Sequence, residues 1–309
     1  MRGAPHALTP IRRPVTQPAP ASPAAQPPRR PPELEDWLNA RLYHPLAARL
    51  ARRLAPTRVT PDMVSAAGAL AIMLAALAYA QGGWPWGAVI GLALHMGWHV
   101  LDGADGDLAR MTGRASPHGE LWDGICDYAG HIVLYLTLGA MAATQIGAGA
   151  WALMIAAGAS RVVQAAHYEG ARRQYSLAVY GTGWMASDAQ PADAGKRRHP
   201  FVVYYLWLTG LIVPHGAELI AAVRDPDRSA ALRNAMQARG GEWLGPISPL
   251  SANYRTLAVG AALLAGRPQW YFLFEVVVLG AALAASWVRV RRVFGAALGH
   301  AALSASTRA

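Results

Sequence analysis

Two long stretches without a single charged residue constrain the fold of this chain most. Residues 63–101 contain no Asp, Glu, Lys or Arg, and neither do residues 128–160. Each stretch is about twice the roughly 20 residues that a helix needs to cross a bilayer, so each predicts a helical hairpin. With 53% hydrophobic and 15% charged residues, the chain is also too apolar for an ordinary soluble domain. We therefore expect an all-α integral membrane protein.

The hydropathy pattern predicts six membrane-spanning helices. They cover about residues 64–80, 86–101, 119–144, 151–168, 256–266 and 270–288. The fifth is short, and Glu275 interrupts the sixth. Residues 201–213 are apolar but too few to cross a bilayer. We expect a cytoplasmic or interfacial helix there, inside an insert that occupies residues 174–253.

The remaining segments have distinct compositions. Residues 1–32 are rich in Pro and Arg, which predicts a disordered tail, and without an apolar run they indicate no cleavable signal peptide. Residues 33–56 repeat leucine every fourth position between arginines, which predicts an interfacial amphipathic helix kinked at Pro45. The six-span domain is then expected over residues 57–293, with a C-terminal tail at 294–309.

The chain carries a net charge of +10, and much of it lies near the N-terminus. A nucleic-acid partner is one interpretation of such charge, but aromatic residues are not interleaved with the arginines. Attraction to anionic membrane lipids needs fewer assumptions. Counting basic residues in the loops places both termini and residues 101–131 on the cytoplasmic side. We expect a multi-pass protein, of the bacterial inner membrane type, with no nucleic-acid partner.

Four carboxylates follow the second predicted span. Asp102 and Asp105 are three residues apart and Asp123 and Asp127 are four apart, so on a helix each pair lies on one face. A carboxylate inside a membrane helix costs roughly 2.5–3.5 kcal/mol, and clustered like charges need protons or cations to neutralise them. Oxygen-only ligands favour a hard divalent cation such as magnesium.

These aspartates belong to the longer pattern D-x2-D-G-x2-A-R-x8-G-x3-D-x3-D, which runs from Asp102 to Asp127. The pattern resembles the signature of the class I CDP-alcohol phosphatidyltransferases, also called CDP-alcohol phosphotransferases. The resemblance implies a six-span fold with an interfacial N-terminal helix, usually homodimeric. It also implies an enzyme of phospholipid biosynthesis, a transferase of substituted phosphate groups. Family members displace CMP from a CDP-linked alcohol by the hydroxyl of a second alcohol.

The resemblance also assigns residues to roles. It implies that two divalent ions, usually magnesium with manganese as the substitute, bind to Asp102, Asp105, Asp123 and Asp127. Asp127 is in addition the base that takes the acceptor's proton. Positions that match the family's donor contacts are Gly106, Arg110, Ser116, Asp62 and Ser65. The last two lie in the run T-P-D-x-x-S at residues 60–65, where plain helix capping explains Asp62 equally well.

Residue chemistry supports these roles. Gly106 has no side chain, so a phosphate can approach the backbone closely, and the guanidinium of Arg110 offers paired donors to phosphate oxygens. Arg161 lies within the fourth predicted span, and an intramembrane arginine tends to line a cavity. It is a candidate for binding an acceptor or lipid phosphate, while pairing with Glu169 or with another span is an alternative.

Two substrate assignments stay open. Either CDP-diacylglycerol is the donor and a small polar alcohol the acceptor, which we favour, or a soluble CDP-alcohol donates its headgroup to diacylglycerol or ceramide. At least one substrate is then a lipid. A divalent-cation transporter is a remote alternative, because its acids would be expected at mid-span. A membrane-anchored interaction module is another, and it would make the motif dispensable.

Overall fold

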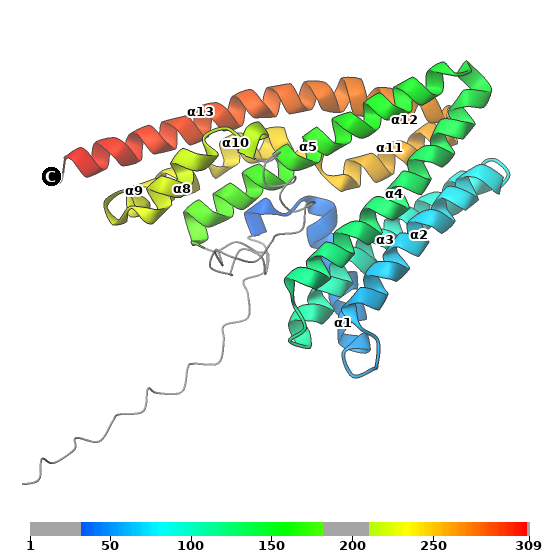
Figure 1. The fold of residues 1–309 in the computed structure, drawn as a ribbon, viewed down its shortest axis with the longest axis horizontal. Coiled ribbons are helices and arrows are strands. Elements are labelled where there is room, and N and C mark those ends of the chain that lie inside the picture. Colours follow the sequence, from blue (N-terminus) through cyan, green and yellow to red (C-terminus); the bar gives the residue numbers. More distant parts are fainter. Residues whose placement is uncertain (1–31, 182–209, 308–309) are drawn as a thin grey trace, which may run out of the picture.

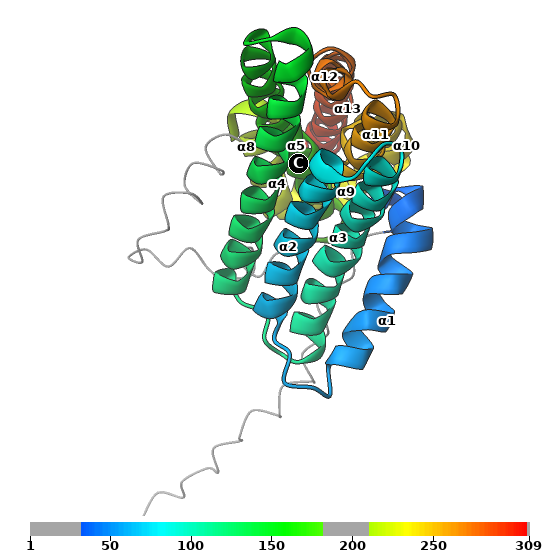
Figure 2. The same ribbon diagram turned by 90° about the vertical axis from the view of Figure 1, so that its right-hand side faces the viewer.

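The computed structural model describes residues 32–181 and 210–307, and within these ranges every regular element is a helix (Figures 1 and 2). The predicted all-α class is therefore confirmed for this part of the chain. The first half contains η1 (Pro32–Leu34), η2 (Asn39–Tyr43), α1 (His44–Leu54), α2 (Pro61–Gln81), α3 (Trp86–Met111), α4 (Pro117–Ile146) and α5 (Gly149–Tyr180). The second half contains α8 (Gly216–Arg224), α9 (Pro226–Ala238), α10 (Gly240–Ile247), η3 (Ser248–Leu250), α11 (Ala252–Leu264), α12 (Pro268–Leu273), η4 (Phe274–Val278) and α13 (Leu279–Ser306).

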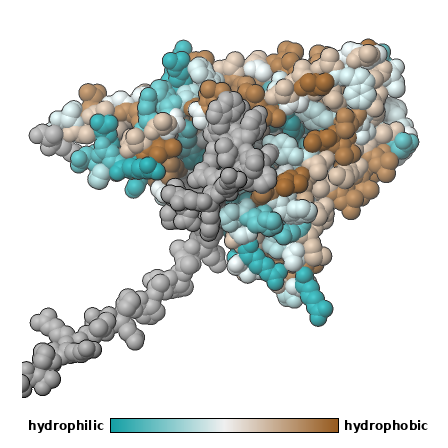
Figure 3. Space-filling model, in the orientation of Figure 1, coloured by the Kyte–Doolittle hydropathy of each residue, from teal (hydrophilic) through white to brown (hydrophobic). Residues whose placement is uncertain are grey.

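Three helical segments are long and apolar enough to cross a membrane by length and composition. They are α2, α4 and the continuous helical stretch Pro268–Ser306, which joins α12, η4 and α13. Helices α3 and α5 also match predicted spans, but each continues into a polar end that carries charged residues. The number of spans, six, stays a prediction. Figure 3 shows apolar surface over the part that holds α4, α11 and α12, and hydrophilic surface over α8 and α9.

Helices α2, α3 and α4 form one bundle, in which they lie side by side in both ribbon views (Figures 1 and 2). Thr60 caps α2, since its hydroxyl accepts a hydrogen bond from the Met63 N–H at 3.3 Å. Glycines permit the close packing: a Cβ at Gly91 would lie 2.3 Å from the Tyr79 ring, and one at Gly130 would lie 3.1 Å from Ile72. The tight bundle holds α3 and α4 in fixed register, which places the two pairs of aspartates.

A second hydrophobic core lies around the C-terminal part of α5 and the long helix α13. Helices α8, α9 and α10 pack against α13 (Figure 1). Trp243 and Phe294 are fully buried at its centre, with ring centroids 5.5 Å apart. Helix α13 continues past residue 293, the expected domain end, to Ser306, and Ala301 is still fully buried. Of the apolar run at 201–213, residues 201–209 lie outside the described part.

A buried ion pair neutralises the acid that interrupts the sixth predicted span. Glu275 is fully buried in the π-helical turn η4, and its Oε1 accepts a hydrogen bond from Arg255 Nε at 2.9 Å. Arg255, on α11, also donates to Gln164 Oε1 at 2.7 Å, and Gln164 in turn donates to the Glu275 carbonyl at 2.9 Å. Three helices are thus linked through polar groups in the interior.

The N-terminal segment contains a π-helical turn directly before Pro45. The π-helical turn η2 ends at Tyr43 and continues directly into α1, which begins at His44, so Pro45 is the second residue of α1. Helix α1 packs on α3, where Gly103 leaves room for Ala47. Asn253 donates to both oxygens of Asp36 at 2.7 Å, which ties this segment to α11. Its interfacial position stays a prediction.

Candidate active site

The acidic cluster lies where α3 and α4 face each other. Asp102, Asp123 and Asp127 each offer a carboxylate oxygen, and these oxygens all lie within 4.8 Å of one another. Asp102 lies on α3 and Asp127 on α4, so the cluster joins carboxylates of two helices. Structure thus brings together the aspartates that sequence spacing placed on two separate helix faces.

Asp105 is the most deeply buried of the four aspartates. It is 5% exposed, and its Oδ2 accepts a hydrogen bond of 2.6 Å from the hydroxyl of Ser65 on α2. Its Oδ1 accepts from the backbone N–H of Gly106, and its carboxyl also interacts with that of Asp123. Ser65, which the motif likeness suggested as a donor contact, therefore orients a predicted metal ligand.

Asp127 has two neighbours that the sequence did not single out as site residues. Trp98 Nε1 donates to Asp127 Oδ1 at 2.7 Å, and His131 Nδ1 lies 2.8 Å from the Asp127 carbonyl. One signal pointed to Trp98: it precedes Asp102 by four residues, so both lie on one face of α3. Its bond to Asp127 on α4 depends on helix packing, which that signal does not contain.

Gly106 and Arg110 are adjacent on the last turns of α3. Arg110 Nη2 donates to Asp107 at 2.7 Å, and the guanidinium folds back over Gly106, where a Cβ would lie 3.3 Å from Nη1. The Arg110 side chain is 40% exposed. The absent side chain at Gly106 therefore gives room to Arg110, whose guanidinium stays accessible to an anionic ligand one turn from Asp105.

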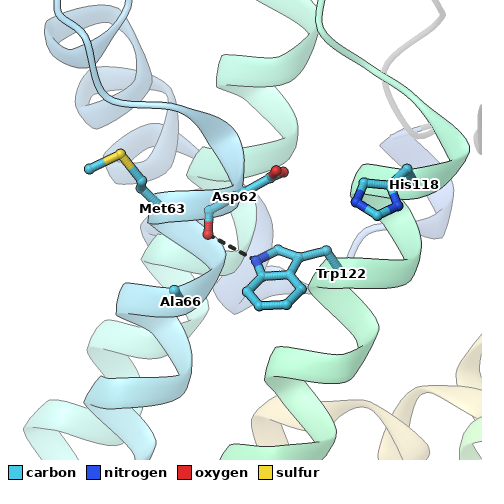
Figure 4. Close-up of a pocket in the computed structure, with 5 residues that line it drawn as sticks. All are labelled: Asp62, Met63, Ala66, His118 and Trp122. Carbon is cyan, nitrogen blue, oxygen red and sulfur yellow. Dashed lines mark hydrogen bonds between the residues drawn. The ribbon is translucent and has the colours of Figure 1, made fainter.

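Ser116 and Asp62 meet at the start of α4. Ser116 is the N-cap of that helix, since its Oγ accepts from the Gly119 N–H at 3.1 Å. Because Thr60 caps α2, the Asp62 side chain is not needed as its N-cap, and it points toward the start of α4 (Figure 4). Trp122 donates to the Asp62 carbonyl at 3.1 Å. Asp62 and Trp122 line a shallow cavity of about 400 Å³, together with Met63, Ala66 and His118.

The cluster suits a hard divalent cation by the chemistry of its donors. Every group is a carboxylate, and magnesium ligands lie at about 2.1 Å, so two oxygens on opposite sides of one ion are roughly 4.2 Å apart. The observed separations within 4.8 Å are of this size. Asp102, Asp123 and Asp127 could therefore hold a metal ion, and Asp105 could join them through Asp123.

A second cavity, of about 590 Å³, lies between α4 and α5 and connects Asp127 with Arg161. The Arg161 guanidinium lies 5.9 Å from the centre of the Tyr135 ring. Among the described residues no carboxylate oxygen lies within 4.0 Å of this guanidinium. Glu169, the suggested partner, accepts a hydrogen bond from Arg172 at 3.1 Å instead. Arg161 thus places a positive charge in the wall of the cavity that reaches Asp127.

Comparison with known proteins agrees with this site. Residues 58–224 match the profile of the family described as CDP-alcohol phosphatidyltransferase, and no curated protein matches the chain. The match contains all four aspartates and covers more than half of the 309 residues. Together with the apolar helices, it indicates an integral membrane protein. The chain therefore belongs to the CDP-alcohol phosphatidyltransferase family, whose members are generally metal-dependent transferases of phosphate-containing groups in phospholipid synthesis.

Proposed function

We propose that this protein transfers a phosphatidyl group from CDP-diacylglycerol to a small polar alcohol and releases CMP. The observation that carries the proposal is the convergence of three motif carboxylates within 4.8 Å beside a cavity that contains Asp127. The lipid donor and the apolar helices require an enzyme in the membrane. We further propose a multi-pass homodimer in the bacterial inner membrane, with the site facing the cytoplasm, where nucleotides and magnesium are available.

Asp127 is the proposed general base. As the acceptor's oxygen forms its bond to the diacylglycerol-linked phosphorus, the bridging P–O bond to CMP breaks and the hydroxyl proton passes to the Asp127 carboxylate. Such proton transfer contributes about 10²–10⁴-fold to a rate. Two magnesium or manganese ions, held by Asp102, Asp105, Asp123 and Asp127, would neutralise the pyrophosphate and stabilise the leaving CMP.

The donor is proposed to lie along the ends of α2, α3 and α4. Arg110 binds a phosphate oxygen, which its 40% exposure permits, and Gly106 keeps the approach open. Asp62 lines the cavity at the start of α4, where Ser116 is the N-cap, on the side where a nucleotide could lie against Trp122. Ser65 acts on the donor indirectly, through Asp105.

The acceptor is proposed to enter the cavity between α4 and α5. Its hydroxyl would meet Asp127 at one end, while Arg161 at the other end binds a phosphate of the acceptor or of a lipid. Arg161→Gln should then raise the KM for the acceptor and leave the KM for the donor unchanged. If the KM for the acceptor is the same in the variant as in the wild type, Arg161 does not bind the acceptor.

A second assignment, a soluble CDP-alcohol donating to a lipid alcohol, has one observation in its favour. The rim of the same cavity carries four exposed apolar or aromatic side chains, Tyr128, Ile132, Leu136 and Ile155. Such a rim on a membrane helix suits an acyl chain that enters from the bilayer. The two assignments differ in which substrate is water-soluble, and this difference can be tested.

The test is CMP release by purified protein with magnesium. One set of reactions offers CDP-diacylglycerol with a panel of polar alcohols, and the other offers CDP-choline or CDP-ethanolamine with diacylglycerol or ceramide. Product from the first set supports the proposal, product from the second set supports the alternative, and no CMP from any pair refutes both. Asp127→Asn and chelation should each abolish turnover, whereas Asp227→Asn, on the exposed face of α9, should leave it unchanged.

A further inference from the structure

We propose that Trp98 is a positioning residue for the reaction, because its indole N–H fixes the orientation of the Asp127 carboxylate. The inference rests on the proposed function for the role of Asp127. The hydrogen bond from Trp98 Nε1 to Asp127 Oδ1 is 2.7 Å long and joins α3 to α4 inside the bundle. Trp98 is only 4% exposed, and together with Asp127 it lines the cavity between α4 and α5.

The indole of Trp98 is clamped on several sides. The His131 ring lies edge-on against it at 4.7 Å between centroids, and the His99 ring lies at 4.4 Å. On the α2 side, a Cβ at Gly68 would lie 3.3 Å from Trp98 Cδ1, so the glycine leaves only the room that the indole needs. His131 also contacts the Asp127 carbonyl at 2.8 Å. The donor therefore has one available direction, toward Asp127.

This arrangement divides the work between the two oxygens of Asp127. Oδ1 accepts the hydrogen bond from the indole, so Oδ2 is the oxygen that this bond leaves for the acceptor's hydroxyl. An indole N–H is a donor only and cannot take up a proton, so Trp98 orients the base without competing with it. Partners that hydrogen-bond a metal-ligating carboxylate typically change metal affinity or activity by 10–100-fold when they are removed.

The experiment compares Trp98→Phe with wild type in the full-length protein. Phenylalanine keeps an aromatic ring but removes the N–H. We expect kcat to fall by about 10- to 100-fold, the KM for the CDP-linked donor to stay within about twofold, and Mn²⁺ affinity to fall by a similar factor. Trp84→Phe is the matched control, since Trp84 also donates one N–H, to the Leu264 carbonyl at 2.9 Å, in the turn between α2 and α3 at the other end of the bundle. It should leave all three quantities unchanged.

Three outcomes would overturn the proposal. The first is an unchanged kcat and Mn²⁺ affinity in Trp98→Phe, even if its thermal stability falls, because the residue would then serve packing alone. The second is a higher KM with unchanged kcat, which would make Trp98 a substrate contact. The third is an equal loss in the Trp84 control. Mn²⁺ binding is measured by electron paramagnetic resonance and does not depend on turnover. It therefore tests Trp98 even if the wild-type protein releases no CMP, and it separates a failure of this inference from a failure of the proposed function.

A second variant displaces the Trp98 indole without removing it. It tests the positioning role if Trp98→Phe does not fold. Gly68→Ala places a methyl group about 3.3 Å from Trp98 Cδ1 and must displace the ring by a few tenths of an ångström. We expect kcat and Mn²⁺ affinity to fall together. Gly97→Ala is the control, because no atom lies within 4 Å of its Cβ position on α3. Equal values in both glycine variants would refute the positioning role.

Discussion

The ion pair between Arg255 and Glu275 gives the sharpest prediction about stability. Glu275 is 0% exposed and Arg255 is 4% exposed, so removing one partner leaves a charge that water cannot reach. Breaking a buried pair in this way typically costs about 3–5 kcal/mol. In Glu275→Leu, Arg255 keeps its bonds to Gln164 Oε1, at 2.7 Å, and to the Leu250 carbonyl. We therefore expect the lower end, about 3 kcal/mol, which is a factor of roughly 150 in the unfolding equilibrium.

The assay is equilibrium unfolding of the purified protein in detergent, with a double-mutant cycle. Arg255→Met combined with Glu275→Leu removes both charges, and such replacements are often close to neutral. The double variant should thus be more stable than either single variant. Glu242→Gln is the control: its pair with Arg239 is 3.6 Å long and about two-fifths exposed, and exposed pairs contribute about 0–1 kcal/mol. A loss below about 1 kcal/mol in Glu275→Leu, or additive effects in the cycle, would refute the reasoning.

Three further predictions concern the site and the bundle. Ser65→Ala removes the 2.6 Å bond to Asp105, so kcat and Mn²⁺ affinity should fall by about 10-fold or more, while equal metal titrations would show that the bond is dispensable. Gly91→Ala places a Cβ 2.3 Å from the Tyr79 ring, and the overpacking should cost about 1–3 kcal/mol in a denaturant titration. Ser116→Ala removes the N-cap of α4 and should cost about 1 kcal/mol, which Ser116→Asn should restore; no recovery would indicate a role beyond capping.

Much of the site could be predicted from sequence, because residues three or four positions apart on a helix lie on the same face. The spacing of Asp102 and Asp105, and of Asp123 and Asp127, places each pair on one helix face whatever surrounds it. The pattern also indicated the family, which the match over residues 58–224 confirms. The partners of these aspartates were less predictable. Ser65 was expected to contact the CDP-linked donor, and the bond from its hydroxyl to Asp105 was not part of that prediction.

Helix ends and pairs of residues on different helices were harder to predict, because they depend on contacts between segments distant in the chain. Hydropathy placed the end of the fourth span near residue 168, yet α5 continues to Tyr180, because its polar end packs under α8 and α9. The apolar pattern could not show that Glu275 has a cation, since Arg255 lies on a different helix.

The sequence by itself determined the helical class, the apolar character of the chain and the two acidic faces, since these depend on composition and on a period of 3.6 residues. Only the tertiary structure decided that the two faces meet, that Trp98 donates a hydrogen bond to Asp127, and that Arg161 shares a cavity with Asp127. The physical reason is that contacts between helices depend on how closely they pack. In this bundle that closeness is set by glycines such as Gly68 and Gly130, whose missing side chains make room for residues distant in the chain.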